Sequence, residues 1–123
     1  MNDQIFFVDD DVDLLESYSE ILQLLGYNIT TFSNGKDALE MYKKNKPALV
    51  FSDIKIPEMD GYELFSRIID FDQDAKVILI TGHENKEKSV IAKNNGLMDI
   101  FYKPVIDDEI ESAIKSAIAK NDC

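Results

Sequence analysis

Acidic residues and one lysine follow four short apolar runs, each at the point where the run ends. Residues 5–8 precede Asp9, Asp10 and Asp11, and residues 48–51 precede Ser52 and Asp53. Residues 77–80 precede Thr81 and Gly82, and residues 100–102 precede Lys103 and Pro104. If the runs are parallel strands, their carboxyl ends share one edge, where open α/β sheets form their sites. Two carboxylates about 4 Å apart repel by roughly 4 kcal/mol at an effective dielectric constant of about 20. Because one lysine cannot balance several acids, the pattern predicts a bound divalent metal.

The segments between these runs alternate strand and helix patterns five times. Strands are predicted at 5–8, 28–32, 48–52, 76–81 and 98–102, and helices at about 14–25, after Asn34, at about 62–69 and 86–95, and after Asp107 or Asp108. The segment 54–61 contains Pro57 and Gly61 and is typical of a loop. Strands that are apolar throughout are typical of a parallel sheet with helices on both faces. The sequence therefore predicts a single α/β domain, (βα)5, over residues 1–123.

Helix boundaries and helix faces are also predicted from the residue types. Asp11 and Asn34 are expected to cap the first two helices, and Gly26 to stop the first. The expected buried face of the last helix is Ile110, Ala113, Ile114, Ala117 and Ile118. The helix at 86–95 has little apolar content beyond 90–92, so it should be the least firmly packed element.

Composition limits the classes of function. The chain has 123 residues, is 45% hydrophobic and carries a formal net charge of −11, which argues against nucleic-acid binding because phosphate contacts dominate that affinity. Apolar stretches are too short for a membrane helix, and residues 1–4 do not resemble a secretory leader. Cys123 is the only cysteine, so no internal disulfide can form. These features indicate a cytoplasmic protein without membrane insertion.

Four short motifs, in order along the chain, resemble those of one known family. They are Asp9–Asp10, Asp53 with Pro57 and Met59-Asp60-Gly61, Thr81–Gly82, and Lys103–Pro104. With these motifs the chain resembles the receiver domain of bacterial two-component response regulators over essentially its whole length. The resemblance implies a flavodoxin-like fold, a doubly wound sheet of five parallel strands in the order 2-1-3-4-5. That strand order comes from the resemblance and not from the periodicity.

The resemblance also assigns roles to the polar residues. Asp53 becomes the acceptor of a phosphoryl group from a phosphohistidine, carried by a sensor histidine kinase or a histidine phosphotransfer protein, or from a small acyl phosphate. Asp10, Asp53 and the backbone carbonyl of Lys55 would hold Mg²⁺, with Asp9 assisting through water. Thr81 and Lys103 would contact the phosphoryl group. The bond between Lys103 and Pro104 is a candidate cis peptide.

Two positions that vary within the family, and one departure from its usual pattern, concern this chain. Lys55 and His83 stand where side chains flank the phosphoryl group; we expect Lys55 to alter the lifetime of the acyl phosphate, and His83 to be an exposed loop residue rather than a base. Ile100 occupies the place of the family's aromatic residue, three before the lysine. Phe101 should point to the opposite face of the sheet. The usual aromatic switch is therefore not expected.

The leading interpretation is a signalling phosphoacceptor that promotes only its own phosphorylation and dephosphorylation and is not otherwise an enzyme. The resemblance implies partner or homodimer contacts through the fourth helix, fifth strand and fifth helix. The main alternative is a pseudo-receiver that binds proteins without being phosphorylated. A metal-dependent phosphatase would need an acid where Lys55 stands, and an acidic first turn would repel a flavin phosphate. The chain could stand alone or belong to a longer regulator or kinase.

Overall fold

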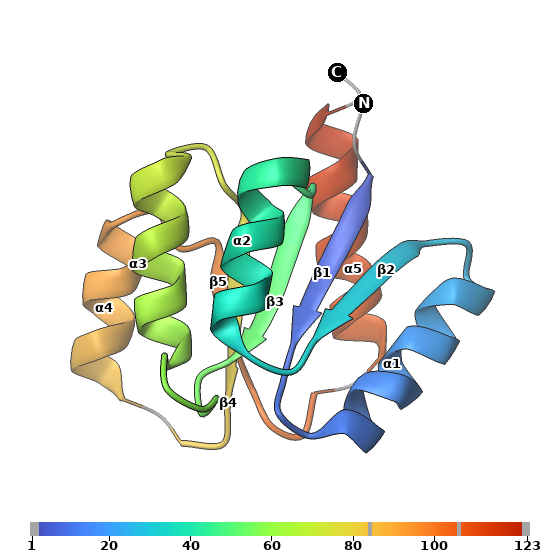
Figure 1. The fold of residues 1–123 in the computed structure, drawn as a ribbon, viewed down its shortest axis with the longest axis horizontal. Helices are drawn as coiled ribbons and strands as arrows, with labels where there is room; N and C mark the ends of the chain where they lie inside the picture. Colours follow the sequence, from blue (N-terminus) through green and yellow to red (C-terminus); the bar gives the residue numbers. More distant parts are fainter. Residues whose placement is uncertain (1–2, 84, 106, 122–123) are drawn as a thin grey trace.

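The computed structural model describes residues 3–83, 85–105 and 107–121, so Cys123 lies outside the described residues. Five strands and five helices alternate along this part of the chain (Figure 1). They are β1 (Gln4–Val8), α1 (Val12–Leu24), β2 (Asn28–Phe32), α2 (Gly35–Asn45), β3 (Leu49–Asp53), α3 (Gly61–Phe71), β4 (Val77–Thr81), α4 (Lys86–Asn94), β5 (Asp99–Tyr102) and α5 (Asp107–Asn121). The alternation predicted from the apolar pattern is confirmed, and the predicted boundaries agree with the observed ones to within two residues.

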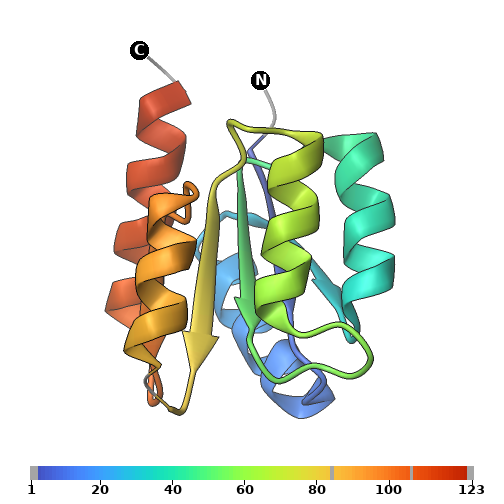
Figure 2. The same ribbon diagram turned by 90° about the vertical axis from the view of Figure 1, so that its left-hand side faces the viewer.

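The strands form one parallel sheet in the order β2-β1-β3-β4-β5. Helices α1 and α5 cover one face, and α2, α3 and α4 cover the other (Figures 1 and 2). This is the predicted flavodoxin-like fold with a doubly wound sheet. The three central strands run through the middle of the molecule and end at the same edge.

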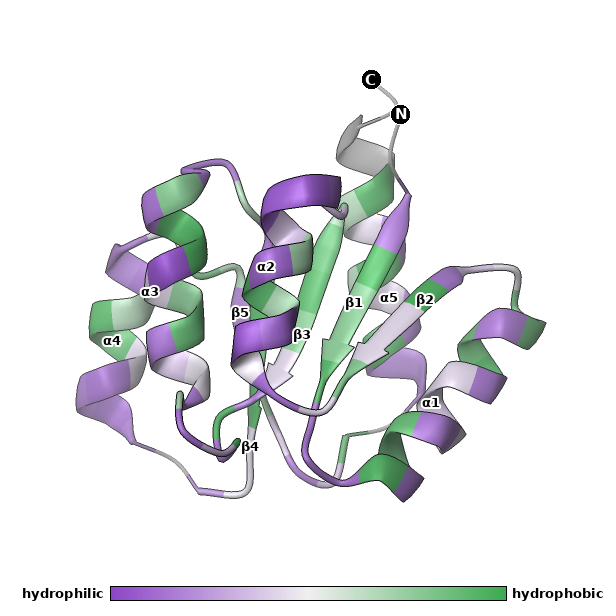
Figure 3. Ribbon diagram, in the orientation of Figure 1, coloured by the Kyte–Doolittle hydropathy of each residue, from purple (hydrophilic) through white to green (hydrophobic). Residues whose placement is uncertain are grey.

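Each face of the sheet packs its own apolar cluster. Along β1, Phe6 and Val8 join the cluster under α2 and α3, while Ile5 and Phe7 join the one under α1 and α5. Every residue of β3 and β4 is buried, and the central strands are accordingly apolar along most of their length (Figure 3). Strands covered on both faces bury successive side chains to opposite sides, which is why the pattern lacked alternation.

Four helices begin at a side-chain cap. Asp11, Asn34, Asp60 and Asn85 each accept a hydrogen bond from the backbone N–H three residues later, at 2.8 to 3.1 Å. The predictions for Asp11 and Asn34 are confirmed. The prediction that Asp107 or Asp108 precedes the last helix is wrong, since both lie inside the first turn of α5. Their carboxylates there favour the positive end of the helix dipole.

Helix α4 buries little of its surface. Of its apolar residues only Ala92 is buried, whereas Val90 and Ile91 are 58% and 55% exposed. In α5, by contrast, the predicted face is inside, with Ile110, Ile114 and Ala117 at 1% exposure or less. The expectation that α4 packs least firmly agrees with these exposures. None of the helices in the described part of the chain is long and apolar enough to cross a membrane.

Gly61 marks the closest approach of α3 to the end of β3. A Cβ at this position would lie 2.7 Å from the carbonyl oxygen of Asp53 and 2.8 Å from the Cα of Ile54. Backbone atoms cannot rotate away from such a contact, so the helix would have to move. The absence of a side chain at Gly61 therefore allows α3 to begin directly beside Asp53.

Replacing Gly61 with alanine should consequently lower the free energy of unfolding by about 1 to 3 kcal/mol, because the added methyl group overpacks this contact. Urea unfolding followed by circular dichroism measures the effect. Gly82→Ala is the matched control: its Cβ would have no neighbour within 4 Å, and stability should change by no more than about 0.5 kcal/mol. Equal stability of Gly61→Ala and the wild type would contradict the steric argument.

Candidate functional site

The predicted site lies at the carboxyl edge of the sheet, where β1, β3, β4 and β5 end. Backbone hydrogen bonds continue past the strands and hold these ends together: Asp9 N–H donates to the Phe32 carbonyl at 3.1 Å, and Lys103 N–H donates to the Thr81 carbonyl at 2.8 Å. Asp53 pairs with Ile80 in the register of β3 and β4. Side chains that are distant in sequence are thereby brought to one rim.

Three carboxylates gather at this rim. Asp9, Asp10 and Asp53 each offer one oxygen atom, and the three oxygens lie within 4.8 Å of one another. Asp9 and Asp53 are only 3% and 6% exposed, whereas Asp10 is exposed. Carboxylate oxygens at this spacing, open to solvent on one side, suit a hard cation such as Mg²⁺ that keeps several waters.

Lys103 provides the positive charge nearest to Asp53. Its Nζ lies 2.9 Å from Oδ2 of Asp53, and the backbone N–H of Lys55 donates to Oδ1 at 3.2 Å. Burial lowers the pKa of Lys103, but the hydrogen bond and the charge of Asp53, followed by the charge of Asp9, outweigh it and raise that pKa overall. The lysine is therefore held as a cation. The predicted cis peptide bond between Lys103 and Pro104 is present.

Asp9 is the residue of the acidic group whose ionisation is disfavoured. The pKa of its carboxyl is raised to about 6, and burial is the largest cause. The backbone N–H of Asp11, 3.0 Å away, lowers this pKa, and the charge of Asp53 raises it. Lys103 counteracts this only in part. The rim is therefore short of positive charge, which is the condition that the sequence pattern predicted.

Thr81 is buried at the end of β4 and its hydroxyl is already engaged. Oγ1 donates to the His83 carbonyl at 2.9 Å and accepts from the His83 N–H at 3.1 Å. Among the hydrogen bonds of the described residues, none joins Thr81 to Asp53. The side chain of His83 is exposed, as expected. Thr81 thus belongs to the turn that leads from β4 toward α4.

Ile100 and Phe101 point to opposite faces of the sheet, as predicted. Ile100 is 5% exposed and packs in the cluster that contains Ala92 and Leu97. The ring of Phe101 lies on the other face, with its centroid 6.4 Å from that of Phe51. An aliphatic side chain therefore occupies the position beneath α4 where the resemblance leads one to expect an aromatic ring.

Two features of the site were missed in the sequence. In the sequence Gly61 is recognisable only as part of a loop and a motif, and its contact with the Asp53 backbone was not predicted. The hydroxyl of Ser52 donates to the Asp53 carbonyl at 2.9 Å and fixes the end of β3 from within. The pair Asp60–Gly61, an acidic helix cap followed by glycine, could have indicated a helix whose first residue packs against the backbone of another segment.

Comparison with known proteins places this geometry in a family. The response regulator receiver domain matches residues 5–115. The chain is 35% identical to sporulation initiation phosphotransferase F of Bacillus subtilis over 115 residues, covering 94% of this chain and 93% of that protein. It is 34% identical to the C4-dicarboxylate transport transcriptional regulatory protein DctD of Rhizobium meliloti, covering 94% of this chain but only 25% of that protein.

A solved structure supports the same conclusion. The CheX–CheY–BeF₃–Mg²⁺ complex of Borrelia burgdorferi contains a chain that is 27% identical, with a TM-score of 0.84, covering 94% of this chain and 88% of that one. The fold, the acidic rim and the sequence match together show that the chain belongs to the response regulator receiver domains of two-component systems. Members of this family act as signalling phosphoacceptors and bind Mg²⁺ at an acidic pocket.

The raised pKa of Asp9 predicts how stability changes with pH. Between pH 3.8 and about 6 the folded protein holds a proton that the unfolded chain has released, so without metal the contribution of Asp9 to stability falls as pH rises through 6. Asp9→Asn should therefore be more stable than the wild type at pH 7.5 by about 1 to 3 kcal/mol, since one pKa unit corresponds to about 1.4 kcal/mol.

Urea titrations of both proteins at pH 4 and 7.5 in the presence of a chelator measure this difference, which should vanish at pH 4. Glu16→Gln, which replaces an exposed acid on α1, is the control: because it keeps Asp9, its stability should change between the two pH values as that of the wild type does. Saturating Mg²⁺ should narrow the difference at pH 7.5. A variant that is less stable than the wild type at pH 7.5 without metal would contradict the prediction.

Proposed function

We propose that residues 1–123 form one receiver domain that accepts a phosphoryl group on Asp53 and changes conformation as a result. The observation that carries the proposal is the setting of Asp53: a buried carboxylate at the end of a central strand, paired with Lys103 at 2.9 Å and grouped with Asp9 and Asp10. The donor would be a phosphohistidine on a sensor histidine kinase or a histidine phosphotransfer protein.

The proposed reaction is a single transfer of a phosphoryl group to Asp53. A carboxylate oxygen of Asp53 would form a bond to phosphorus while the phosphorus–nitrogen bond of the donor breaks, with its electron pair returning to the imidazole. Catalysis of such a transfer depends on positioning and on charge stabilisation. Lys103 is held as a cation at Oδ2 of Asp53, where it can pair with an oxygen of the incoming group.

The residues present also fit a magnesium ion. Asp10 and Asp53 would coordinate directly, with the backbone carbonyl of Lys55, and Asp9 would act through water; the spacing of the three carboxylates supports this set. A bound ion would neutralise charge on the transferring phosphoryl oxygens. The raised pKa of Asp9 supports this proposal, because Lys103 counteracts the charge of the acids only in part.

The switch would begin at Thr81. Phosphorylation adds about −1.5 to −2 charges and three acceptor oxygens, and to reach them the hydroxyl must leave the backbone of His83. Rearrangement of this turn would reach α4, which buries only Ala92. The exposed Val90 on α4 and Tyr102 on β5 support an output or homodimer contact through α4, β5 and α5.

Acceptance of the phosphoryl group is tested by mass spectrometry. The protein incubated with Mg²⁺ and acetyl phosphate should gain one HPO₃ group, about 80 Da, and lose it on treatment with hydroxylamine. Asp53→Asn should show no gain, while a control substitution of a distant acid, Asp74→Asn, should leave the yield unchanged. An adduct that persists in Asp53→Asn would overturn the assignment, and a folded wild type that gains nothing would favour a pseudo-receiver.

Lys55 is proposed to set the lifetime of the acyl phosphate. Its backbone N–H contacts Asp53 and its side chain is exposed at the rim, where it can contact the phosphoryl group or obstruct the attacking water. Lys55→Ala should change the first-order rate of dephosphorylation, followed after removal of acetyl phosphate, several-fold, on the order of 1 kcal/mol in barrier. Glu58→Ala in the same loop is the control. Equal rates for Lys55→Ala and the wild type would remove the idea.

A further inference from the structure

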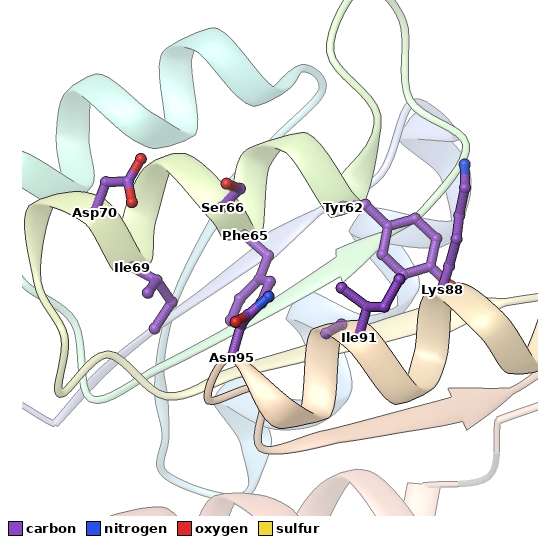
Figure 4. Close-up of a pocket in the computed structure, with 9 residues that line it drawn as sticks. Tyr62, Phe65, Ser66, Ile69, Asp70, Lys88, Ile91 and Asn95 are labelled. Carbon is purple, nitrogen blue, oxygen red and sulfur yellow. The ribbon is translucent and has the colours of Figure 1, made fainter.

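Helices α3 and α4 enclose an apolar groove of about 480 Å³ (Figure 4). Phe65 and Ala92 are buried at its base, while Tyr62 and Ile69 on α3 are half-buried. Ile91 on α4 also lines the groove and is 55% exposed. Large apolar side chains on the α3 wall, opposite an Ile91 that is open to solvent on the α4 wall, form a surface that can receive apolar side chains of a partner.

The two ends of the groove carry opposite charge. At one end Lys88 holds its Nζ 5.5 Å from the centre of the Tyr62 ring, and both residues lie in the first turns of their helices. The positive ends of both helix dipoles therefore point to the same end. Asp70 and Asn95 lie at the opposite end, near the last residues of the same helices (Figure 4).

The α4 side of the groove is basic on an otherwise acidic protein. Helix α4 carries Lys86, Lys88 and Lys93 against the single acid Glu87, whereas the chain as a whole has a net charge of −11. An approaching acidic segment is attracted locally to α4 and repelled elsewhere. Charge therefore directs the choice of partner as well as its orientation in the groove.

From these features we propose that the groove between α3 and α4 binds a short amphipathic helix of a partner protein, which sets apolar residues against Ile91 and Phe65 and a carboxylate against Lys88. Tyr62 and Asp70 are eight residues apart, about 12 Å along a helix, so two turns of the partner fill the groove. A second copy of this chain is the less favoured occupant, because two bodies of charge −11 repel each other.

This surface is separate from the phosphoryl site and goes beyond the proposed function. It lies on the side of α4 that faces α3, away from α5 (Figure 2). Binding here needs neither Asp53 nor the acidic rim. The Asp53→Asn variant should therefore bind the partner helix as well as the wild type does, which separates failure of this proposal from failure of the phosphoacceptor assignment.

The probe is a synthetic helix with the sequence of residues 12–25 of this chain, kept helical by a staple between positions 19 and 23. It presents leucines together with Asp13, Glu16 and Glu20. A second peptide, with these three acids replaced by lysine, is the matched control. In amide NMR titrations the acidic peptide should bind about tenfold tighter than the lysine peptide, with shifts at Phe65, Ile91 and Ala92.

Variants of α4 locate the site. Ile91→Glu should abolish binding of the acidic peptide, and Lys88→Glu should invert the preference toward the lysine peptide. Val90→Glu, on the same helix and equally exposed but outside the groove, should bind as the wild type does.

Three results would overturn the proposal. They are no binding of the stapled acidic peptide, equal affinity for the two peptides, or an equal loss of affinity for the acidic peptide in Val90→Glu and Ile91→Glu. Shifts of the groove residues on concentrating the protein alone would assign the groove to a second copy and also reject the proposed occupant.

Discussion

Mutual repulsion between carboxylates at the edge of the sheet is the constraint on which the site depends. Asp9 and Asp53 are buried there with Asp10 beside them, and burial together with the charges of Asp53 and Asp10 raises the pKa of Asp9 to about 6. The ion pair between Lys103 and Asp53 offsets only part of this charge. The arrangement is unfavourable for the protein without a cation, and a bound cation would relieve it, as the proposed function requires. It is a local cost in stability at the candidate site.

The rest of the fold makes that cost tolerable. Strands β3 and β4 are buried at every residue, and the sheet carries a separate apolar cluster on each face. Backbone hydrogen bonds beyond the strand ends, with Ser52 and Gly61 packed against Asp53, keep the rim in place. Functional groups at the last residues of rigid strands, or on the loops that follow them, are positioned precisely without a rigid surface.

Helix α4 connects the two proposals because it is the least buried helix among the described residues. Its single buried side chain, Ala92, leaves Val90 and Ile91 at the surface. The turn that holds Thr81 leads into its first residues, and the groove shared with α3 lies along its other side. A thinly packed helix can respond to a small change in a neighbouring turn and can also offer its exposed apolar side chains to a partner.

The sequence by itself determined the alternation of elements, the helix caps at Asp11 and Asn34, and the acids and lysine that meet at one edge. Apolar runs, turn residues and short-range capping are local, so they can be predicted without coordinates. Only the tertiary structure decided that Gly61 contacts Asp53, that Thr81 bonds to His83, and that α3 and α4 leave a groove. These features arise from distances between segments that are far apart in the chain, and no local pattern records such distances.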